Sequence, residues 1–487
     1  MLSLLGIQIC YFRLTTPSIC SYFISRNHID PTSPQELPTL FLTMNKHSAS
    51  KPILLMLYPY PMSEFLYNLY ELNNFSPYCD VVVWDISMLT NFKFASALAY
   101  ARATRSNIVS ISTWTQFFRS VADLKQLSLK HALTIRTFAA TNAAEFLVAT
   151  HLYYSFRKSP IKRFDVINDG LPVLTAASAD YSPHKAQSTA LIARFRAFTQ
   201  HLSSLQEINI RLANTIFRTL ARIYSGALTH RLVAGQHYLP EGLRGKRKGT
   251  TMLFGHSDDY SNYLGTSLDK TAEITHSQKF AVMLDAPGPA FTDDSLQLGR
   301  APSCTAAVWY PALAKFFDHL EFDTGVSVEV AGHYKSTHPP IATCFENRAV
   351  HYGRTLELVR DCEFVITRMS MAISYAVIFH KPVIFIYSDE IMADRLSMQW
   401  MFHMASWLGT TPINIDSPPR NFTSLLQVKE SKYKAYETAC LTSATTSRPN
   451  YQIILEDIMG ITTASGPDTV RNLPPANQST SEHNSNR

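Results

Sequence analysis

The sequence predicts an α/β fold of two domains, in which parallel sheets are flanked by helices. Short apolar runs bounded by turn residues recur along the chain, and segments with helical spacing separate them. Such runs are typical of parallel strands that are buried on both faces. The alternation occurs once before and once after residues 235–249, which are rich in Gly and Pro and therefore indicate a linker.

In the first half, apolar runs at 53–58, 80–84, 107–111 and 164–167 predict strands. A helix is expected at about 92–103, where Ala95, Leu98 and Ala99 have helical spacing, and another at about 142–155. Apolar residues three and four positions apart continue through residues 186–234, which predicts an amphipathic helix pair or a broken helix.

In the second half, strands are expected at 280–284, 326–331, 349–351, 363–367 and 382–387. An amphipathic helix is expected at 308–322, and a short helix follows Thr355, which is predicted to cap it. Residues 371–379 are nearly all apolar and predict a buried helix. This helix and the strands on either side of it form a compact βαβ unit.

These patterns divide the chain at four points. We expect residues 1–43 to be an N-terminal extension or a mis-assigned start, because Met44 shortly precedes the first clean strand. Residues 44–235 form the first domain, 236–275 a linker and 276–461 the second domain. Residues 462–487 are rich in Ser, Asn and Pro with little to bury, so we expect a disordered tail.

Composition limits the classes of partner. The net charge of +6 is spread over 487 residues, whereas nucleic-acid binding needs basic residues clustered on one face. The densest basic run, residues 244–248, indicates a solvated linker or a contact with an anionic lipid or polymer. The seven cysteines form no CxxC pair and no zinc spacing, so we expect buried thiols, no metal and a cytoplasmic location.

Position in the fold selects the candidate site residues. Ligands of open parallel sheets bind beyond the carboxyl ends of the strands. The polar residues just after a predicted strand are Asp85, Asp169, Asp285, His333, Lys335, Arg368, Ser370 and Asp389. We expect the loop from Arg368 to Ser370 to be the centre of a nucleotide-binding type of site. No GxGxxG follows a strand and no phosphate-binding GxxxxGK[ST] loop is present, which disfavours dinucleotides and ATP hydrolysis.

Several of these residues have two readings from the sequence. Ser370 is either a helix N-cap or part of a phosphate site at the start of that helix. Arg368 either pairs with Glu363 or Asp361, or binds a phosphate or carboxylate of a ligand.

The remaining candidates are equally open. His333 and Lys335 can be ordinary polar residues, or they can bind and neutralise a leaving phosphate. Asp169, in Asn168-Asp169-Gly170, is either part of a common turn or a base for an acceptor hydroxyl. Asp285 is either a loop carboxylate or a substrate hydrogen-bond acceptor.

Residues 280–390 resemble bacterial surface-polysaccharide biosynthesis proteins of the glycosyltransferase-B (GT-B) type. This stretch is less than a quarter of the chain. The segments that carry the resemblance are, in order, residues 280–285, the helix containing Trp309-Tyr310-Pro311, 330–336, 345–348, 353–359, 366–374 and 381–385. The resemblance implies two facing Rossmann-like domains, with a nucleotide-sugar donor held mainly by the second and an acceptor by the first.

Related bacterial sialyltransferase-like enzymes carry an acidic-acidic-Gly motif, a His-Pro motif and a Ser-rich motif. Asn168-Asp169-Gly170, His333-Tyr334 and Ser370-Met371 stand at matching places, each with one departure, and Arg368 stands where such proteins tend to have His. The resemblance then implies Asp169 as the catalytic base and His333 as the group that stabilises or protonates the departing phosphate. It implies Lys335, Arg368 and Ser370 for the donor phosphate, Arg348 with Glu357 for the base or ribose, and Asp285 for substrate.

The function implied is transfer of a sugar from a CMP- or UDP-linked donor to a bacterial surface glycan, lipopolysaccharide or capsule. The acceptor is a glycan or a lipid-linked glycan, and no metal or other cofactor is needed beyond the nucleotide sugar. The location is cytoplasmic, with peripheral contact to the inner membrane face as a further expectation. Two alternatives stay open: a nucleotide-sugar 2-epimerase and a non-catalytic glycan-assembly protein on a transferase fold.

Overall fold

A computed structural model describes twelve stretches of the chain. They are residues 51–98, 102–138, 140, 142–168, 170–172, 228–238, 249–266, 278–285, 289, 302–333, 344–443 and 447–463. The predictions for residues 1–43, for 173–227 of the long helical pattern and for the tail beyond residue 463 lie outside these residues.

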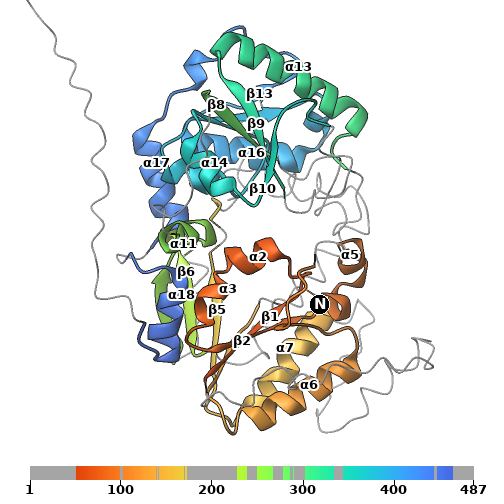
Figure 1. The fold of residues 1–487 in the computed structure, drawn as a ribbon, viewed down its shortest axis with the longest axis vertical. Helices are drawn as coiled ribbons and strands as arrows, with labels where there is room; N and C mark the ends of the chain where they lie inside the picture. Colours follow the sequence, from red (N-terminus) through yellow and green to blue (C-terminus); the bar gives the residue numbers. More distant parts are fainter. Residues whose placement is uncertain are drawn as a thin grey trace, which may run out of the picture. The chain divides into compact units, whose positions relative to one another are not determined.

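The first domain is built on a parallel sheet (Figure 1). Its described strands lie in the order β3-β2-β1-β4-β5-β6-β7, and each neighbouring pair is parallel. The bounds are β1 (Ile53–Tyr58), β2 (Asp80–Asp85), β3 (Ile108–Ser110), β4 (Leu133–Arg136), β5 (Lys162–Ile167), β6 (His230–Ala234) and β7 (Thr251–Gly255).

The second domain repeats the order. Its described strands lie in the order β10-β9-β8-β11-β12-β13, again with parallel neighbours. The bounds are β8 (Phe280–Leu284), β9 (Ser327–Gly332), β10 (Val350–Tyr352), β11 (Val365–Thr367), β12 (Val383–Tyr387) and β13 (Ile413–Asn414). In each sheet the first three strands are added in one direction from the central strand, and the later strands are added on its other side. This is the doubly wound Rossmann order. The predicted fold class, two Rossmann-like domains with parallel sheets flanked by helices, is confirmed.

Helices connect the strands of both sheets. In the first domain they are α2 (Glu64–Leu69), α3 (Leu72–Phe75), α4 (Ser87–Thr90), α5 (Phe92–Ala97), α6 (Trp114–Leu127), α7 (Ala143–Phe156) and α11 (Asp258–Gly265). In the second they are α13 (Ala306–Thr324), α14 (Thr355–Asp361), α15 (Ile373–Ile378), α16 (Arg395–Leu408) and α17 (Glu430–Tyr436). The helix predicted to be capped by Thr355 begins there, but its N-cap is Arg354, without a side-chain cap.

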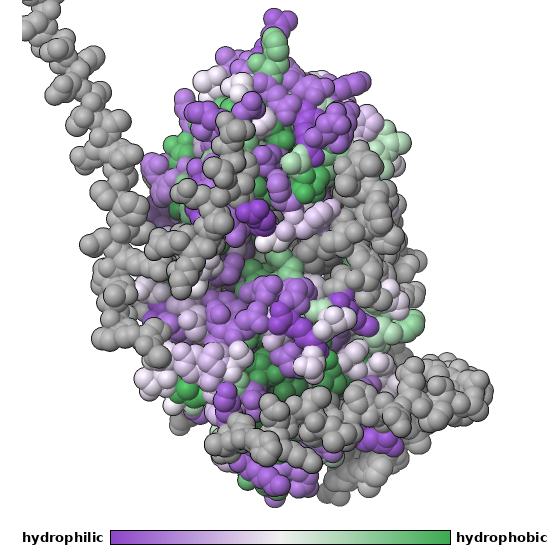
Figure 2. Space-filling view, in the orientation of Figure 1, coloured by the Kyte–Doolittle hydropathy of each residue, from purple (hydrophilic) through white to green (hydrophobic). Residues whose placement is uncertain are grey.

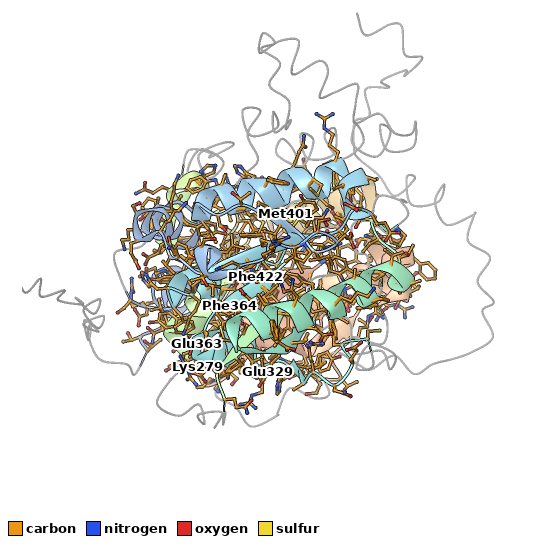
Figure 3. All side chains as sticks on the ribbon, turned by 90° about the horizontal axis from the view of Figure 1, so that it is seen from above. Lys279, Glu329, Glu363, Phe364, Met401 and Phe422 are labelled. Carbon is orange, nitrogen blue, oxygen red and sulfur yellow. The ribbon has the colours of Figure 1, made fainter. Side chains whose placement is uncertain are left out.

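The second sheet is buried on both faces, as its apolar runs predict. Alternate residues of β8 point into different cores: Phe280, Val282 and Leu284 into one, Ala281 and Met283 into the other. Helices α14, α15, α16 and α17 cover the first core, and α13 covers the second. Figure 3 labels Phe364 and Phe422, which belong to the second core, and Met401 of α16, which belongs to the first.

The end of the chain returns to the first domain. After α17 the described chain continues into α18 (Asn450–Ile453) and the π-helical turn η10 (Ile454–Met459). Ile454, Leu455 and Ile458 are buried in the core that contains Leu54 and Met56 of β1. The end of the predicted second domain therefore packs on the first sheet, because its apolar side chains complete that core.

The predicted linker is the main difference from expectation. Residues 236–275 contain β7 and α11, and β6 lies at the end of the predicted helical stretch. Two short strands, β4 and β6, and the helix α6 were not predicted. Four of the five β7 residues are partly or fully exposed, and an edge strand of this kind lacks the continuous apolar run that marks a buried strand.

Polar side chains dominate the face of the molecule that Figure 2 shows. On the face shown in Figure 2, hydrophilic side chains cover most of the coloured area, and hydrophobic ones show in smaller patches. In the described part of the chain, no helix combines the length and the apolar character that crossing a membrane requires. As predicted, Cys79, Cys304, Cys362 and Cys440 are buried thiols.

Candidate functional site

Three predicted residues meet at the carboxyl edge of the second sheet. Strands β8 and β11 are neighbours, with Leu284 opposite Thr367, so Asp285 and Arg368 follow paired positions. This is where the strand order reverses, the position at which doubly wound sheets bind ligands. The amide of His333, at the end of β9, lies 3.5 Å from Asp285 Oδ2. The prediction that these residues lie at one edge therefore agrees with the structure.

Arg368 is the buried cation of this edge. Its residue is only 9% exposed, and its Nη1 donates to Ser303 Oγ at 3.2 Å and lies 3.8 Å from Cys304 Sγ. The guanidinium lies 6.0 Å from the centre of the Trp309 ring. These contacts hold the guanidinium in one place, as an anion-binding arginine requires.

The two carboxylates that could have paired with Arg368 pair with other cations. Glu363 pairs with Lys279 at 3.2 Å, and both are labelled in Figure 3. Asp361 pairs with Arg360 at 2.6 Å. The reading of Arg368 as the partner of Glu363 or Asp361 is therefore wrong, because each carboxylate has a nearer cation.

The charge of Asp285 contributes to raised pKa values of several neighbouring side chains. Burial, followed by the charge of Asp285, raises the pKa of the Tyr310 hydroxyl above its usual range. The same two causes raise the pKa of Cys344 and of Tyr352. The Tyr352 ring packs so closely on Gly332 that a Cβ there would lie 2.5 Å from a ring carbon. Asp285 thus supplies the negative charge of a site whose neighbours are mostly neutral.

His333 is neutral at physiological pH. Burial lowers the pKa of its imidazole to about 4, because the charged form loses hydration there. A neutral ring can donate one N–H to a phosphate, but it carries no positive charge and is a poor source of a proton at pH 7. Of the two roles expected for His333, the structure favours the hydrogen bond.

Ser370 caps a turn. Its Oγ accepts a hydrogen bond from the Ala372 amide at 3.2 Å, and α15 begins only at Ile373. The predicted helix 371–379 is therefore too long at its start, and Met371 is 50% exposed rather than buried. The N-cap of α15 is Ala372, so Ser370 caps the turn before the helix and is not the helix N-cap that one reading predicted.

Arg348 has a structural role. Its Nη2 lies 2.7 Å from both Asp318 and Glu321 of α13, and its guanidinium lies 5.1 Å from the centre of the Phe317 ring. Burial opposes the charge, but hydrogen bonds to Glu321 and Asp318 outweigh it and raise the pKa of Arg348. These contacts give Arg348 a role in holding α13, and its expected contact with the base or ribose stays a prediction.

We expect Arg348→Met to lower the free energy of unfolding by about 1–3 kcal/mol, the loss of charge-assisted hydrogen bonds in a half-buried place. Urea unfolding would measure it. Arg360→Met is the matched control, since Arg360 pairs with its sequence neighbour Asp361. Weaker nucleotide binding without a loss of stability would contradict this role for Arg348.

Glu357 lies in the first turn of α14, half-buried. Its charge is one of the causes that raise the pKa of Tyr375, after burial and Asp259. It therefore lies near the first turn of α15. Asp169 and Lys335 lie outside the described residues.

The residues on either side of Asp169 approach α11, and Gly170 also approaches α15 of the second domain. Asn168 Nδ2 donates to Asp258 Oδ1 at 2.5 Å. Gly170 has φ +71°, and a Cβ on it would lie 3.2 Å from Ser257 Cβ and 3.5 Å from Ser374 Oγ. Glycine suits this turn because the backbone is left-handed and two other segments press on it. The end of β5 thus touches the first turn of α15.

The sequence analysis missed Asp258 and Asp259. They begin α11, after the N-cap Ser257, directly behind β7. Burial first, and then the charge of Asp258, raise the pKa of Asp259 to about 7, although hydrogen bonds with Ser374 and Tyr375 oppose the rise. The rule that selected Asp285 would have selected both aspartates had the edge strand β7 been recognised.

Within the described residues, no group of three or more His, Cys, Asp or Glu side chains could hold a metal ion.

No family model and no curated protein matches the chain. Among solved structures, it is similar to the wall teichoic acid polymerase TagF, with 13% identity over 84% of this chain and 90% of the other, and a TM-score of 0.47. It is also similar to a Methanocaldococcus jannaschii UDP-GlcNAc 2-epimerase, with 8% identity over 79% of this chain and 98% of the other, and a TM-score of 0.37. Its similarity to Phytolacca americana UGT2 is 10% identity over 80% of this chain and 93% of the other, with a TM-score of 0.40. Likenesses this remote leave the substrate open, since one fold hosts many functions.

Proposed function

We propose that the protein transfers a sugar from a CMP- or UDP-linked donor to a bacterial surface glycan of the lipopolysaccharide or capsule type. The observation that carries the proposal is the buried Arg368 at the reversal point of the second sheet. A guanidinium held in place by Ser303 and Cys304 suits the phosphates of a nucleotide sugar. The proximity of Gly170, in the loop after β5, to the first turn of α15 supports an acceptor side next to the donor side.

Each residue then has a defined task. Arg368 and Lys335 hold the donor phosphates, and Ser370 shapes their loop. Neutral His333 donates a hydrogen bond to the departing phosphate, and Asp285 accepts one from the donor. Asp169 takes the proton of the acceptor hydroxyl. Positive side chains can carry the charge of the leaving group, so the reaction is proposed to need no metal.

The test is turnover with defined donors. Incubation with CMP-, UDP- and GDP-sugars should release nucleotide from one donor class, and faster when an acceptor glycan is present. Asp169→Ala should lower transfer by about 100-fold or more, the usual contribution of a general base. Unchanged transfer would refute Asp169 as the base, and failure to bind any of the nucleotides would refute the function.

A nucleotide-sugar 2-epimerase is the second candidate. It needs carboxyl groups that exchange protons with a sugar ring, and the structure adds Asp258 and Asp259 at the carboxyl edge of β7. The pKa of about 7 for Asp259 is suited to proton exchange at neutral pH. Isomerised nucleotide sugar without release of nucleotide, detected by NMR of the same incubations, would favour this candidate over transfer.

A further inference from the structure

The start of helix α11 contacts two loops that belong to different sheets. Ser257 caps the helix by accepting from the Tyr260 amide, and Asp258 and Asp259 form its first turn. Consecutive side chains of an α-helix point about 100° apart, so neighbouring carboxylates diverge. Each of these two aspartates has a different set of partners.

Asp258 faces the first sheet. Its Oδ1 accepts from Asn168 Nδ2, at the end of β5. The same turn rests on the helix cap, because Gly170 approaches the Ser257 side chain closely. Asp258 therefore fixes the segment that contains the candidate base.

Asp259 faces the second sheet. Its carboxyl group interacts with the side chains of Ser374 and Tyr375, the first two positions after Ile373 in α15, and both interactions lower its pKa. The Tyr375 hydroxyl also accepts from Asn262 Nδ2 at 3.1 Å, one turn further along α11. Ser374 Oγ in turn donates to the Met371 carbonyl at 2.9 Å, inside the loop 368–372. Asp259 is thereby linked to the loop that carries Arg368.

We propose that Asp258 and Asp259 form a clamp that holds the end of β5 and the loop 368–372 in fixed relative positions. They are positioning residues, one for each half of the site. The consequence for catalysis rests on the proposed function, but the clamp itself is a property of the free protein. A short helix with two adjacent acids is sufficient for it, because Asp258 contacts Asn168 and Asp259 contacts Ser374 and Tyr375 from the same helical turn.

The clamp is expected to respond to pH. The groups that face Asp259 are Asp258 on its own helix, Tyr375 of α15 and Tyr436 of α17, while Glu357 of α14 acts on Tyr375. None of them is a cation. Folding raises the pKa of Asp259 from 3.8 to about 7, so the folded protein holds a proton that the unfolded chain releases in this window. The clamp should be strongest at acidic pH and should loosen as the pH rises through about 7.

Hydrogen exchange of the free protein tests the clamp without any substrate. Asp258→Ala should raise exchange about tenfold at residues 165–168 and also at 373–378, on the far side. Tyr375→Phe, which keeps the shape, should raise exchange at 165–168 as well. Glu430→Gln is the control, since it changes a carboxyl group on the exposed face of α17. Changes confined to the mutated side would overturn the clamp.

Two further readouts separate positioning from general stability. In the wild type, exchange at residues 373–378, corrected for intrinsic rates, should increase between pH 6 and 8. In Asp259→Asn this increase should be absent. With a turnover assay in hand, the same variant should lower kcat about tenfold and leave KM nearly unchanged, because binding groups remain while their relative placement is lost. An intact clamp in a protein that turns over no nucleotide sugar would refute the proposed function alone.

Discussion

Replacing Arg368 by glutamine should lower nucleotide-sugar turnover by about 100-fold or more. A buried guanidinium that meets a phosphate makes charge-assisted hydrogen bonds, and glutamine keeps polarity without the charge. The contacts to Ser303 and Cys304 fix the guanidinium before a ligand arrives, so little reorganisation is needed on binding. Steady-state kinetics with the preferred donor would measure both kcat and KM.

The matched control is Arg360→Gln. Arg360 has the same chemistry in the same domain, but it pairs with Asp361 at the end of α14. We expect it to leave turnover within about twofold of the wild type, since a surface pair is worth little. Equal losses in the two variants would mean that net charge, and not the Arg368 site, governs the reaction. Arg368→Lys should recover only part of the activity, because an ammonium group lacks the planar fork of donors.

Replacing Glu71 by glutamine should raise the free energy of unfolding by about 3 kcal/mol at pH 7. Glu71 is 6% exposed at the start of α3, with a left-handed φ of 56°. Burial is the main cause that raises the pKa of its carboxyl group from 4.5 to about 8. Between these two pH values the folded protein keeps a proton that the unfolded chain releases, so stability falls as the pH rises through the window.

The surroundings of Glu71 explain why burial is the main cause of its raised pKa. Ser261 Oγ donates to Glu71 Oε2 at 2.6 Å and accepts from the Asn450 amide at 2.6 Å. Glu71 Oε1 is buried without a hydrogen-bond partner among the described residues, and a Cβ on Gly265 would lie 2.6 Å from it. None of the ion pairs among the described residues includes this carboxyl group. Glutamine keeps the bond from Ser261 and cannot ionise.

Urea unfolding at several pH values would test the Glu71 prediction. The gain should be near zero at about pH 4.5, where the unfolded chain is itself half protonated, and should grow toward pH 8. Glu64→Gln is the control of opposite sign, because its hydrogen bond with Arg105 lowers the pKa of that carboxyl group. A pH-independent gain would show that packing, rather than ionisation, sets the effect.

The sequence alone determined most strands of both sheets and the edge at which Asp285, His333 and Arg368 meet. Buried parallel strands leave an unbroken apolar run, and the residue that follows each run must lie at the carboxyl edge of the sheet. Information of this kind is local, so the chain order suffices to predict it.

Only the tertiary structure shows which charged side chains can contact a ligand and which stabilise the fold. Arg348 is a predicted ligand contact that also pairs with Asp318 and Glu321 of α13, and Asp258 and Asp259 lay unnoticed in a predicted linker until β7 placed them against α15. Glu71 and Ser261 are 190 residues apart and form one hydrogen bond. The role of a charged side chain depends on its desolvation and on its partners, and both come from segments that only the folded chain brings together.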